Sequence, residues 1–253
     1  MAQPVAVAFQ AALPQEVQPF LRRMHARRLQ VQELPAWEFT WRTGRGVVVV
    51  SGLGEDAAAR TAAWVLEHYQ PQVFVGLGFG GAVTPELPAG AVVLGGSYWR
   101  YEPETKALEE LATPPFPAWS TALEGKLRAA GLPVFRGSLV STRKIIPKAP
   151  HADLLANLTH PVLDLETGAA TAAAGERNLP FLALRVITDM AGEEIPDFLV
   201  QAVQEGKTPT AAEVLTWVAA DPSRVPVLCR LWRRSRLAAQ HLGRVLAMVL
   251  EVR

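Results

Sequence analysis

Cysteine is almost absent from this sequence, which contains one, Cys229. One cysteine cannot close a disulfide within the chain and cannot build a thiolate metal cluster. We therefore expect a core or interface thiol at this position and a protein of a reducing compartment. The five histidines form no recognisable ligand pair, so we expect neither a metal site nor an organic cofactor.

Long hydrophobic runs are also absent. A helix that spans a membrane needs about 20 consecutive apolar residues, and the strongest run here, Val47 to Val50, is followed at once by Ser51 and Gly52. The first residues lack the positive segment and apolar core of a signal peptide. We expect a cytoplasmic protein with no transmembrane segment.

No charge of one sign predominates. The chain of 253 residues has 25 Lys and Arg against 24 Asp and Glu, a formal net charge of +1. Binding a nucleic acid polymer through a broad surface requires a clustered cationic excess, so we exclude that class of partner. Hydrophobic residues make up 49% of the chain and charged residues 19%, a composition that excludes intrinsic disorder.

The standard nucleotide-binding signatures are missing as well. Two glycine clusters occur, Gly52-Leu53-Gly54 and Gly78-Phe79-Gly80-Gly81, and neither has the G-x-G-x-x-G spacing. No Gly-Lys-Ser/Thr follows either cluster. The sequence therefore does not favour a Rossmann or a P-loop site.

What the sequence does contain is an alternation of short aliphatic runs with longer Ala/Leu/Glu-rich stretches. Strands are predicted near 5–9, 37–41, 46–51, 73–76, 91–94, 134–141, 162–165 and 181–188, with helices between most of them and a surface loop over 103–117. This alternation predicts an α/β sheet covered on both faces. No linker divides the chain, so we expect one domain over 1–253 with a helical extension over about 211–253.

Three features lie at predicted strand ends, where ligands bind in open α/β sheets. The glycine cluster after Val75 either lets main chain approach a ligand or makes a tight turn. Glu166 and Asp189 each have an ordinary structural explanation. Glu166 can be an acid that interacts with the dipole of the following helix, and Asp189 can be an N-cap or a loop acid. With Glu16 after the first strand, however, they suit glycosyl chemistry, in which one carboxyl protonates the leaving group and another stabilises positive charge or activates the nucleophile.

Four segments carry a resemblance to a known family. They are Ser51-Gly52-Leu53-Gly54, Gly78-Phe79-Gly80-Gly81 with Pro85 and Gly90-Ala91-Val92-Val93, Leu163-Asp164-Leu165-Glu166-Thr167-Gly168-Ala169, and Leu184-Arg185-Val186-Ile187-Thr188-Asp189. Their order and spacing resemble the motifs of the nucleoside phosphorylase and nucleosidase superfamily over almost the whole chain. The last two segments are the specific signal.

The resemblance implies a single-domain, three-layer α/β/α sandwich with a central mixed, twisted sheet. It implies an enzyme that cleaves the N-glycosidic bond of a purine-type nucleoside by phosphorolysis, with inorganic phosphate as co-substrate, or by hydrolysis. It also implies a homodimer or a higher homo-oligomer. The alternative is a catalytically inactive nucleoside-binding or regulatory protein on the same fold.

The resemblance also implies a role for each site residue. Asp189 acts on purine N7, and Glu16 activates the attacking water in hydrolytic members. Glu166 holds the ribose hydroxyls, because an anion there stabilises a ribosyl oxocarbenium ion. The remaining expected substrate-binding residues are Gly78, Phe79, Gly80, Ile145, Ile146, Leu165 and Arg185.

Two departures from the family pattern affect the substrate. Phe79 stands where many members have serine, so one hydroxyl ligand for water or phosphate is missing. Thr142-Arg143-Lys144-Ile145 stands where many nucleosidases have Gly-Asp-Ala-Phe, which puts a preference for adenine in doubt. Arg143 and Lys144 either bind phosphate or a charged base edge, or lie in a solvated loop.

The tail from Gly206 to Leu242 resembles the hopanoid-associated phosphorylase group, which implies a substrate resembling an adenosylated lipid. The tail also places apolar residues at helical spacing among six arginines, from Arg224 to Arg244. A basic amphipathic helix of this kind can lie on an anionic membrane surface. The interpretation that we favour is a terminal helix whose apolar stripe packs on the sheet.

Overall fold

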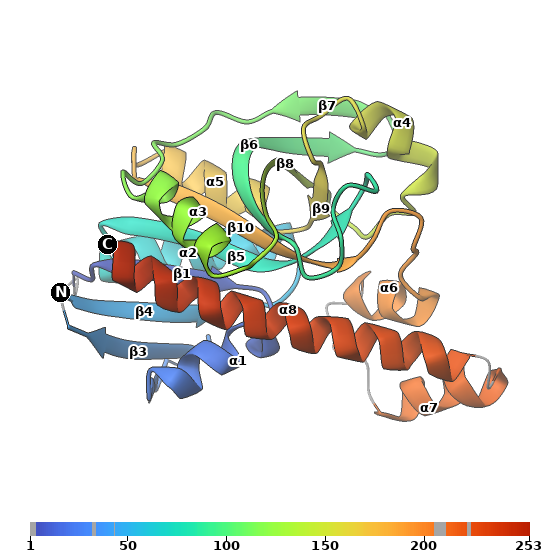
Figure 1. Ribbon diagram of the computed structural model, residues 1–253, viewed down its shortest axis with the longest axis horizontal. Helices are drawn as coiled ribbons and strands as arrows, with labels where there is room; N and C mark the ends of the chain where they lie inside the picture. The colour runs from blue at the N-terminus through green and yellow to red at the C-terminus, as the bar shows by residue number, and fades with distance from the viewer. Residues whose placement is uncertain (1–3, 32–33, 43, 205–210, 222–223) are drawn as a thin grey trace.

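One mixed sheet runs through the computed structural model, which describes residues 4–31, 34–42, 44–204, 211–221 and 224–253 (Figure 1). Its strands are β1 (Val7–Ala11), β2 (Arg27–Leu29), β3 (Ala36–Trp41), β4 (Gly44–Val50), β5 (Val73–Ala82), β6 (Val92–Glu102), β7 (Ala107–Glu110), β8 (Val134–Ser141), β9 (Val162–Asp164) and β10 (Phe181–Asp189). Most of the central strands are almost wholly apolar, as expected where both faces of a sheet are covered.

Part of the sheet closes on itself. The strands follow the order β10-β6-β8-β9-β5-β1-β4-β3-β2, and β5 also pairs with β10. Strands β5, β10, β6, β8 and β9 therefore form a ring, from which β1, β4, β3 and β2 extend. This half of the sheet closes because β5 is long enough to pair with β10 over most of its length and with β9 at its end.

Helices cover both faces, which confirms the three-layer α/β/α arrangement (Figure 1). On one face lie α2 (Glu55–Tyr69) and α5 (Thr167–Gly175), and on the other α1 (Pro14–Arg23), α3 (Ser120–Ala129) and α8 (Val225–Val252). The shorter helices are η1 (Ala149–His151), α4 (Ala152–Leu155), α6 (Asp197–Gln204) and α7 (Ala211–Ala220).

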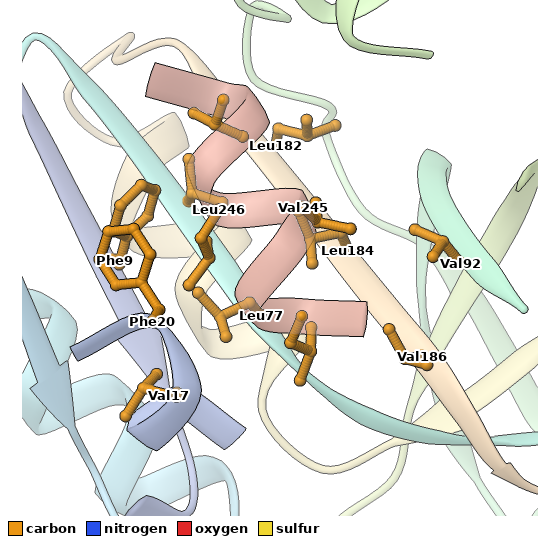
Figure 2. Packing of buried hydrophobic residues seen from close by; sticks show 14 of the residues in the cluster. Phe9, Val17, Phe20, Leu77, Val92, Leu182, Leu184, Val186, Val245 and Leu246 are labelled. Carbon is orange, nitrogen blue, oxygen red and sulfur yellow. The ribbon is translucent and has the colours of Figure 1, made fainter. Parts of the chain in front are cut away.

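The larger core lies under α1 and α8 (Figure 2). The Phe9 and Phe20 rings meet edge to face with centroids 5.5 Å apart. Val245 and Leu246 of α8 are fully buried and belong to the same cluster as Leu184 of β10. The carboxyl half of α8 is therefore part of the core.

The amino half of α8 differs, because it extends past the sheet alongside α7 (Figure 1). Leu215 of α7 is 68% exposed and Trp232 of α8 is 62% exposed. Cys229 is also exposed, so it is not a core thiol, and the other alternative, an interface thiol, stays a prediction. Gly206 and Pro222, which contribute to the tail's resemblance, lie outside the described residues. No described helix is both long and apolar enough to cross a membrane.

Two further expectations about elements need correction. Strand β5 does not end at Gly76 but continues through the glycine cluster to Ala82. The acidic stretch 103–117 is not loop throughout, because β7 forms an antiparallel pair with the end of β6. In both places the local composition favours a turn or loop, and pairing with neighbouring strands decides the outcome.

Candidate active site

A cavity of about 160 Å³ lies beside the ends of β1, β8, β9 and β10. The three acids singled out in the sequence, Glu16, Glu166 and Asp189, all line it. Its other lining residues are Ala12, Leu13, Leu53, Phe79, Gly80, Gly81, Thr142, Ile145, Ile146, Lys148, Leu163, Asp164, Leu165, Thr188, Glu194 and Ile195. The site thus joins segments that are far apart in the chain.

Glu16 is held rigidly in the first turn of α1. Its Oε2 accepts hydrogen bonds from the main-chain N–H groups of Ala12 (2.9 Å) and Leu13 (2.8 Å). Its Oε1 accepts one from the N–H of Phe79 on β5, also at 2.9 Å. Burial nevertheless raises the pKa of this carboxyl, since these bonds oppose the loss of solvent without cancelling it. A carboxylate with a raised pKa is a stronger base toward water.

Glu166 lies directly beyond β9. Strand β9 runs antiparallel to β5 and pairs Leu163 with Gly81, so the chain after it turns back along β5 toward Glu16. Glu166 Oε1 accepts a hydrogen bond from the N–H of Gly54 at 2.9 Å. Burial, only partly offset by the Arg185 guanidinium, raises the pKa of Glu166 to about 7.

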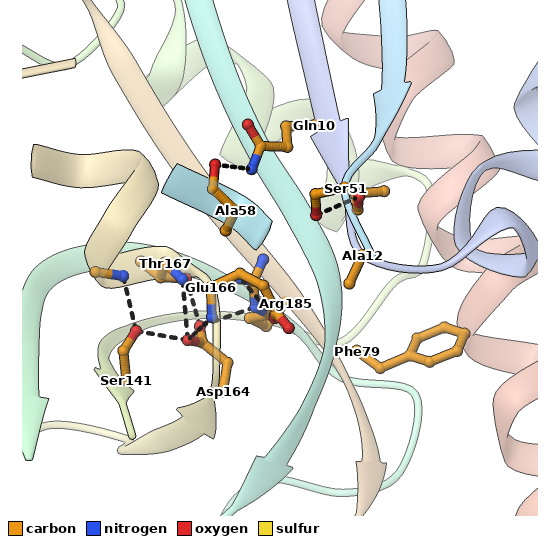
Figure 3. Close-up of polar contacts among 12 residues, drawn as sticks. Gln10, Ala12, Ser51, Ala58, Phe79, Ser141, Asp164, Glu166, Thr167 and Arg185 are labelled. Atoms are coloured by element: carbon orange, nitrogen blue, oxygen red, sulfur yellow. Dashed lines mark hydrogen bonds and ion pairs between the residues drawn. The ribbon is translucent and has the colours of Figure 1, made fainter. Parts of the chain in front are cut away.

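Asp164 organises this corner of the site, and sequence reasoning did not single it out (Figure 3). Its Oδ1 accepts from Ser141 Oγ (2.6 Å) and from the N–H groups of Glu166 (3.2 Å) and Thr167 (3.1 Å). Its Oδ2 accepts from Thr167 Oγ1 and from Arg185 Nε, the latter at 2.9 Å. Asp164 therefore fixes the start of α5 and the direction of Glu166.

Arg185 and Gly78 support the site from behind and are not among the residues that line the cavity. The buried Arg185 guanidinium pairs with Asp164, and its Nη2 lies 4.0 Å from Glu166 Oε2. A Cβ added at Gly78 would lie 2.9 Å from Glu16 Oε1. Both expected substrate-binding residues thus position the acids that face the cavity.

Asp189 ends β10 beside Lys148, a residue that sequence reasoning missed. Thr188 Oγ1 donates a hydrogen bond to Asp189 Oδ1 at 2.9 Å. The Lys148 ammonium lies 2.6 Å from Oδ2, an ion pair whose angles do not make a directed hydrogen bond. Both side chains are almost fully buried.

The glycine cluster makes room for these contacts. A Cβ at Gly81 would lie 2.5 Å from Asp189 Oδ2, and one at Gly80 would lie 2.5 Å from Val162 Cγ1. None of the cluster's glycines has a positive φ. The cluster therefore serves close approach of neighbouring groups, and the tight-turn interpretation is wrong.

The remaining walls of the cavity are apolar. Ile145, Ile146, Leu165, Leu53 and Phe79 line it; that the first three bind substrate stays a prediction. Apolar surface beside a few fixed acids is typical of a site for a small organic ligand. The phenyl ring of Phe79 extends away from Asp164 and Arg185 in Figure 3.

Arg143 and Lys144 lie at the surface, in agreement with the interpretation of this segment as a solvated loop. Arg143 lies 3.6 Å from Glu55 with its side chain 76% exposed, and Lys144 pairs with Glu104 at the surface. Neither lines the cavity.

The signals for the missed residues are of different strength. Asp164 is an acid inside a predicted apolar strand, two residues before Glu166. Acids are rarely buried unless they are paired, so this position was a signal that the sequence offered. Lys148 lies in a segment with basic and proline residues that resembles an exposed loop. The position of Lys148 beside Asp189 follows only from the fold.

Comparison with known proteins agrees with this geometry. Residues 6–220 match the model of the phosphorylase superfamily. Among solved structures, futalosine hydrolase of Helicobacter pylori strain 26695 is 11% identical with a TM-score of 0.70, covering 99% of this chain and 98% of that one.

Two nucleosidase structures are similar to the same extent. The 5′-methylthioadenosine/S-adenosylhomocysteine nucleosidase of Neisseria meningitidis, in complex with methylthio-immucillin-A, is 16% identical (TM-score 0.71; 97% and 98% covered). A variant of the Helicobacter pylori enzyme with 5′-methylthioadenosine in its active site is 12% identical (TM-score 0.72; 99% and 100% covered). At these identities the likeness establishes the fold, and the family match covers most of the sequence. The chain therefore belongs to the phosphorylase superfamily, which confirms the family and the class of enzyme, nucleoside phosphorylase or nucleosidase, that its motifs predicted.

Proposed function

We propose that this protein hydrolyses the N-glycosidic bond of a purine-type nucleoside. The observation that carries the proposal is the presence of Glu16, Glu166 and Asp189 on one small cavity, each held by its own contacts. Cleavage of this bond leaves positive charge on the sugar and negative charge on the departing base. A site for the reaction needs an anion near the sugar, a base for water and a polar group at the purine.

Each acid suits one of these tasks. Glu166 lies near Asp164 and Glu16, and its ionised form stabilises an oxocarbenium ion. Glu16, with its raised pKa, accepts the proton of the attacking water. Asp189, beside Lys148, binds the base and assists its departure.

The charge of the cavity supports hydrolysis over phosphorolysis. Among the described residues that line it, Lys148 is the one cationic side chain, and Asp189 already pairs with it. Five carboxyl groups line the same cavity, those of Glu16, Asp164, Glu166, Asp189 and Glu194. A phosphate dianion would meet repulsion there, whereas water would not. Phe79 also supplies no hydroxyl to an anion.

A nucleoside panel tests the proposal. Purified protein is incubated with purine nucleosides, unsubstituted and 5′-substituted, with and without inorganic phosphate, and the products are identified by mass spectrometry. Free base and free sugar are expected, at a rate that phosphate does not change. Sugar phosphate would mean phosphorolysis, and no release from any substrate would favour the nucleoside-binding protein.

The 5′ substituent and the setting of the protein are further proposals. The apolar walls near Leu53 and Phe79 support a bulky 5′ group, so the panel includes an adenosyl-lipid-like compound. A homo-oligomer, a cytoplasmic location and contact of the arginines of α8 with membranes rest on the sequence. Light scattering during size-exclusion chromatography tests the first, and co-sedimentation with anionic vesicles tests the last.

A further inference from the structure

The base end of the cavity contains a buried lysine. Lys148 follows β8, is 5% exposed, and lines the same cavity as Asp189 and Thr188. A buried ammonium is costly unless paired, so its position is a specific feature of the site.

Lys148 is fixed at both of its ends. Its main-chain N–H donates to the carboxylate of Glu194, with N–O distances of 3.1 and 3.2 Å. Its Nζ donates to the main-chain carbonyls of Met190 (2.9 Å) and Asp189 (3.2 Å). Gly81 gives the pair its space, since a Cβ there would lie 3.3 Å from Lys148 Cε and 2.5 Å from Asp189 Oδ2.

The three N–H bonds of the ammonium have three acceptors within reach. Among the described residues its directed hydrogen bonds go to the two carbonyls of Met190 and Asp189. The third acceptor is Asp189 Oδ2, at 2.6 Å, so a base that binds to Asp189 lies at an edge that this carboxylate shares with the ammonium. A base bound against Asp189 therefore meets an ammonium that can only donate.

We propose that Lys148 is a specificity-determining residue that selects a leaving base with an exocyclic carbonyl, a 6-oxopurine, over a 6-aminopurine. The inference rests on the proposed function, in which Asp189 binds the purine. An exocyclic carbonyl accepts a hydrogen bond from the ammonium, whereas an exocyclic amino group presents a second donor to it. A site built around a donor rejects a ligand that lacks the acceptor.

This selection distinguishes the leaving base from the adenine of an adenosyl-lipid-like substrate. The merely structural alternative is that Lys148 only ties the end of β10 to the segment after β8. Loss of such a tie would weaken binding of both kinds of base equally. Only a role in selection changes their ratio.

The test compares matched substrates. We measure kcat and KM for inosine against adenosine and for 5′-methylthioinosine against 5′-methylthioadenosine, using the wild type, Lys148→Met and Lys148→Gln. The matched control is Lys126→Met, which removes an exposed lysine of α3 that pairs with Glu251. Circular dichroism establishes that each variant is folded.

The wild type is expected to prefer the 6-oxo substrate in kcat/KM by about tenfold or more, the effect of one hydrogen bond to a charged donor. Lys148→Met should lose this preference, and Lys126→Met should keep it. A wild type that prefers the 6-amino substrates, or a Lys148 variant that retains the wild-type ratio, overturns the inference and leaves the proposed function intact.

A binding measurement separates the two proposals if no nucleoside is cleaved. Calorimetric titration of the wild type with hypoxanthine and with adenine needs no turnover. Absence of cleavage refutes the proposed function, while tighter binding of hypoxanthine, lost in Lys148→Met, still supports selection by Lys148. Equal binding of the two bases, or binding of neither, refutes it.

Discussion

Asp189 has a chemical role in the proposed reaction and a structural contact with Lys148, and substitutions separate the two. In Asp189→Asn the side chain keeps its shape but loses the negative charge beside Lys148. We expect kcat for base release to fall by about 10²-fold or more, with ligand binding largely kept. Steady-state kinetics and equilibrium binding of the same substrate measure the two effects.

The structural contact of Asp189 with Lys148 should contribute to the free energy of unfolding. Asp189→Asn leaves the buried ammonium unpaired, which costs about 3–5 kcal/mol in comparable buried pairs. The double variant Asp189→Asn/Lys148→Met removes both charges and should regain most of this stability, as urea denaturation would measure. The kcat of the double variant for base release should remain as low as that of Asp189→Asn. Wild-type base release by either variant would contradict the role given to Asp189.

Ionisation of Glu166 should make the free energy of unfolding depend on pH. Its folded-state pKa is raised to about 7 from the ordinary 4.5, so the fold favours the protonated form. The stabilisation from this form is complete below pH 4.5 and is lost as the pH rises toward about 7. Relative to Glu166→Gln, which cannot ionise, the wild type should lose on the order of 3 kcal/mol of unfolding free energy between about pH 4 and pH 8.

Denaturation of both proteins across this range measures the difference. The control is Glu67→Gln, at an exposed position of α2, for which a flat difference is expected. If ionised Glu166 holds the ribose, as we propose, kcat/KM should rise through about pH 7. A difference between wild type and Glu166→Gln that does not change with pH would show that Glu166 ionises as in solvent.

At the residue scale, the sequence predicted the acids that face the cavity better than the groups that hold them. Glu166 and Asp189 stand in recognisable motifs at strand ends, and both line the cavity. Asp164 and Lys148 act through partners 21 and 41 positions away in the chain. No local pattern encodes such a pairing, because it depends on which strands become neighbours.

At the scale of elements, the segment after β10 joins the cavity to the last helix. Glu194 and Ile195 line the cavity, and the neighbouring Glu193 pairs with Arg234 and Arg230 of α8. Glu194 in turn accepts a hydrogen bond from the main-chain N–H of Lys148. The segment is thus held on one side by α8 and on the other by Lys148.

Arg234→Met tests whether this attachment shapes the site. We expect KM to rise by up to about fivefold with a smaller change in kcat, since one partly exposed ion pair contributes about 0–1 kcal/mol. The control is Arg233→Met, an exposed arginine one position earlier on α8. Equal kinetics for the two variants would mean that the ion pair does not affect the cavity.

Strand β5 explains why element boundaries were harder to predict than element types. Its glycines reduce strand propensity, so the predicted strand stopped at Gly76, whereas pairing with β10 extends from Phe74 to Gly81. Side chains from α1, α5, β9 and β10 occupy the space that the glycines leave. The strand is stabilised by its neighbours and not by its own composition.

At the scale of the whole molecule, the layers were predictable and the closed ring was not. Alternating apolar strands and helices indicate a covered sheet in any such chain. Closure requires β5 to pair with β10 on one edge and with β9 on the other. These two strands are about 20 residues apart, and the hydrophobic pattern does not specify their order in the sheet. The cavity lies at this ring, so the position of the site followed from the closure.

Helix α8 leads to the last prediction, because its two halves belong to different environments. Leu246 is fully buried against the sheet, while Leu237, 39% exposed, lies in the half that extends past it. Leu246→Ala should lower the free energy of unfolding by about 2–5 kcal/mol through lost burial and the cavity left behind. Leu237→Ala, the same change on the same helix, should cost about 1 kcal/mol or less.

Urea denaturation distinguishes these outcomes through the midpoint, provided that the slope with denaturant is unchanged. Because the cavity is bordered by strand ends and not by α8 itself, folded Leu246→Ala should keep the wild-type kcat at temperatures below its transition. Equal costs for the two substitutions would mean that the carboxyl half of α8 is not packed in the core. In that case the whole helix, with its arginines, would be free to contact another surface.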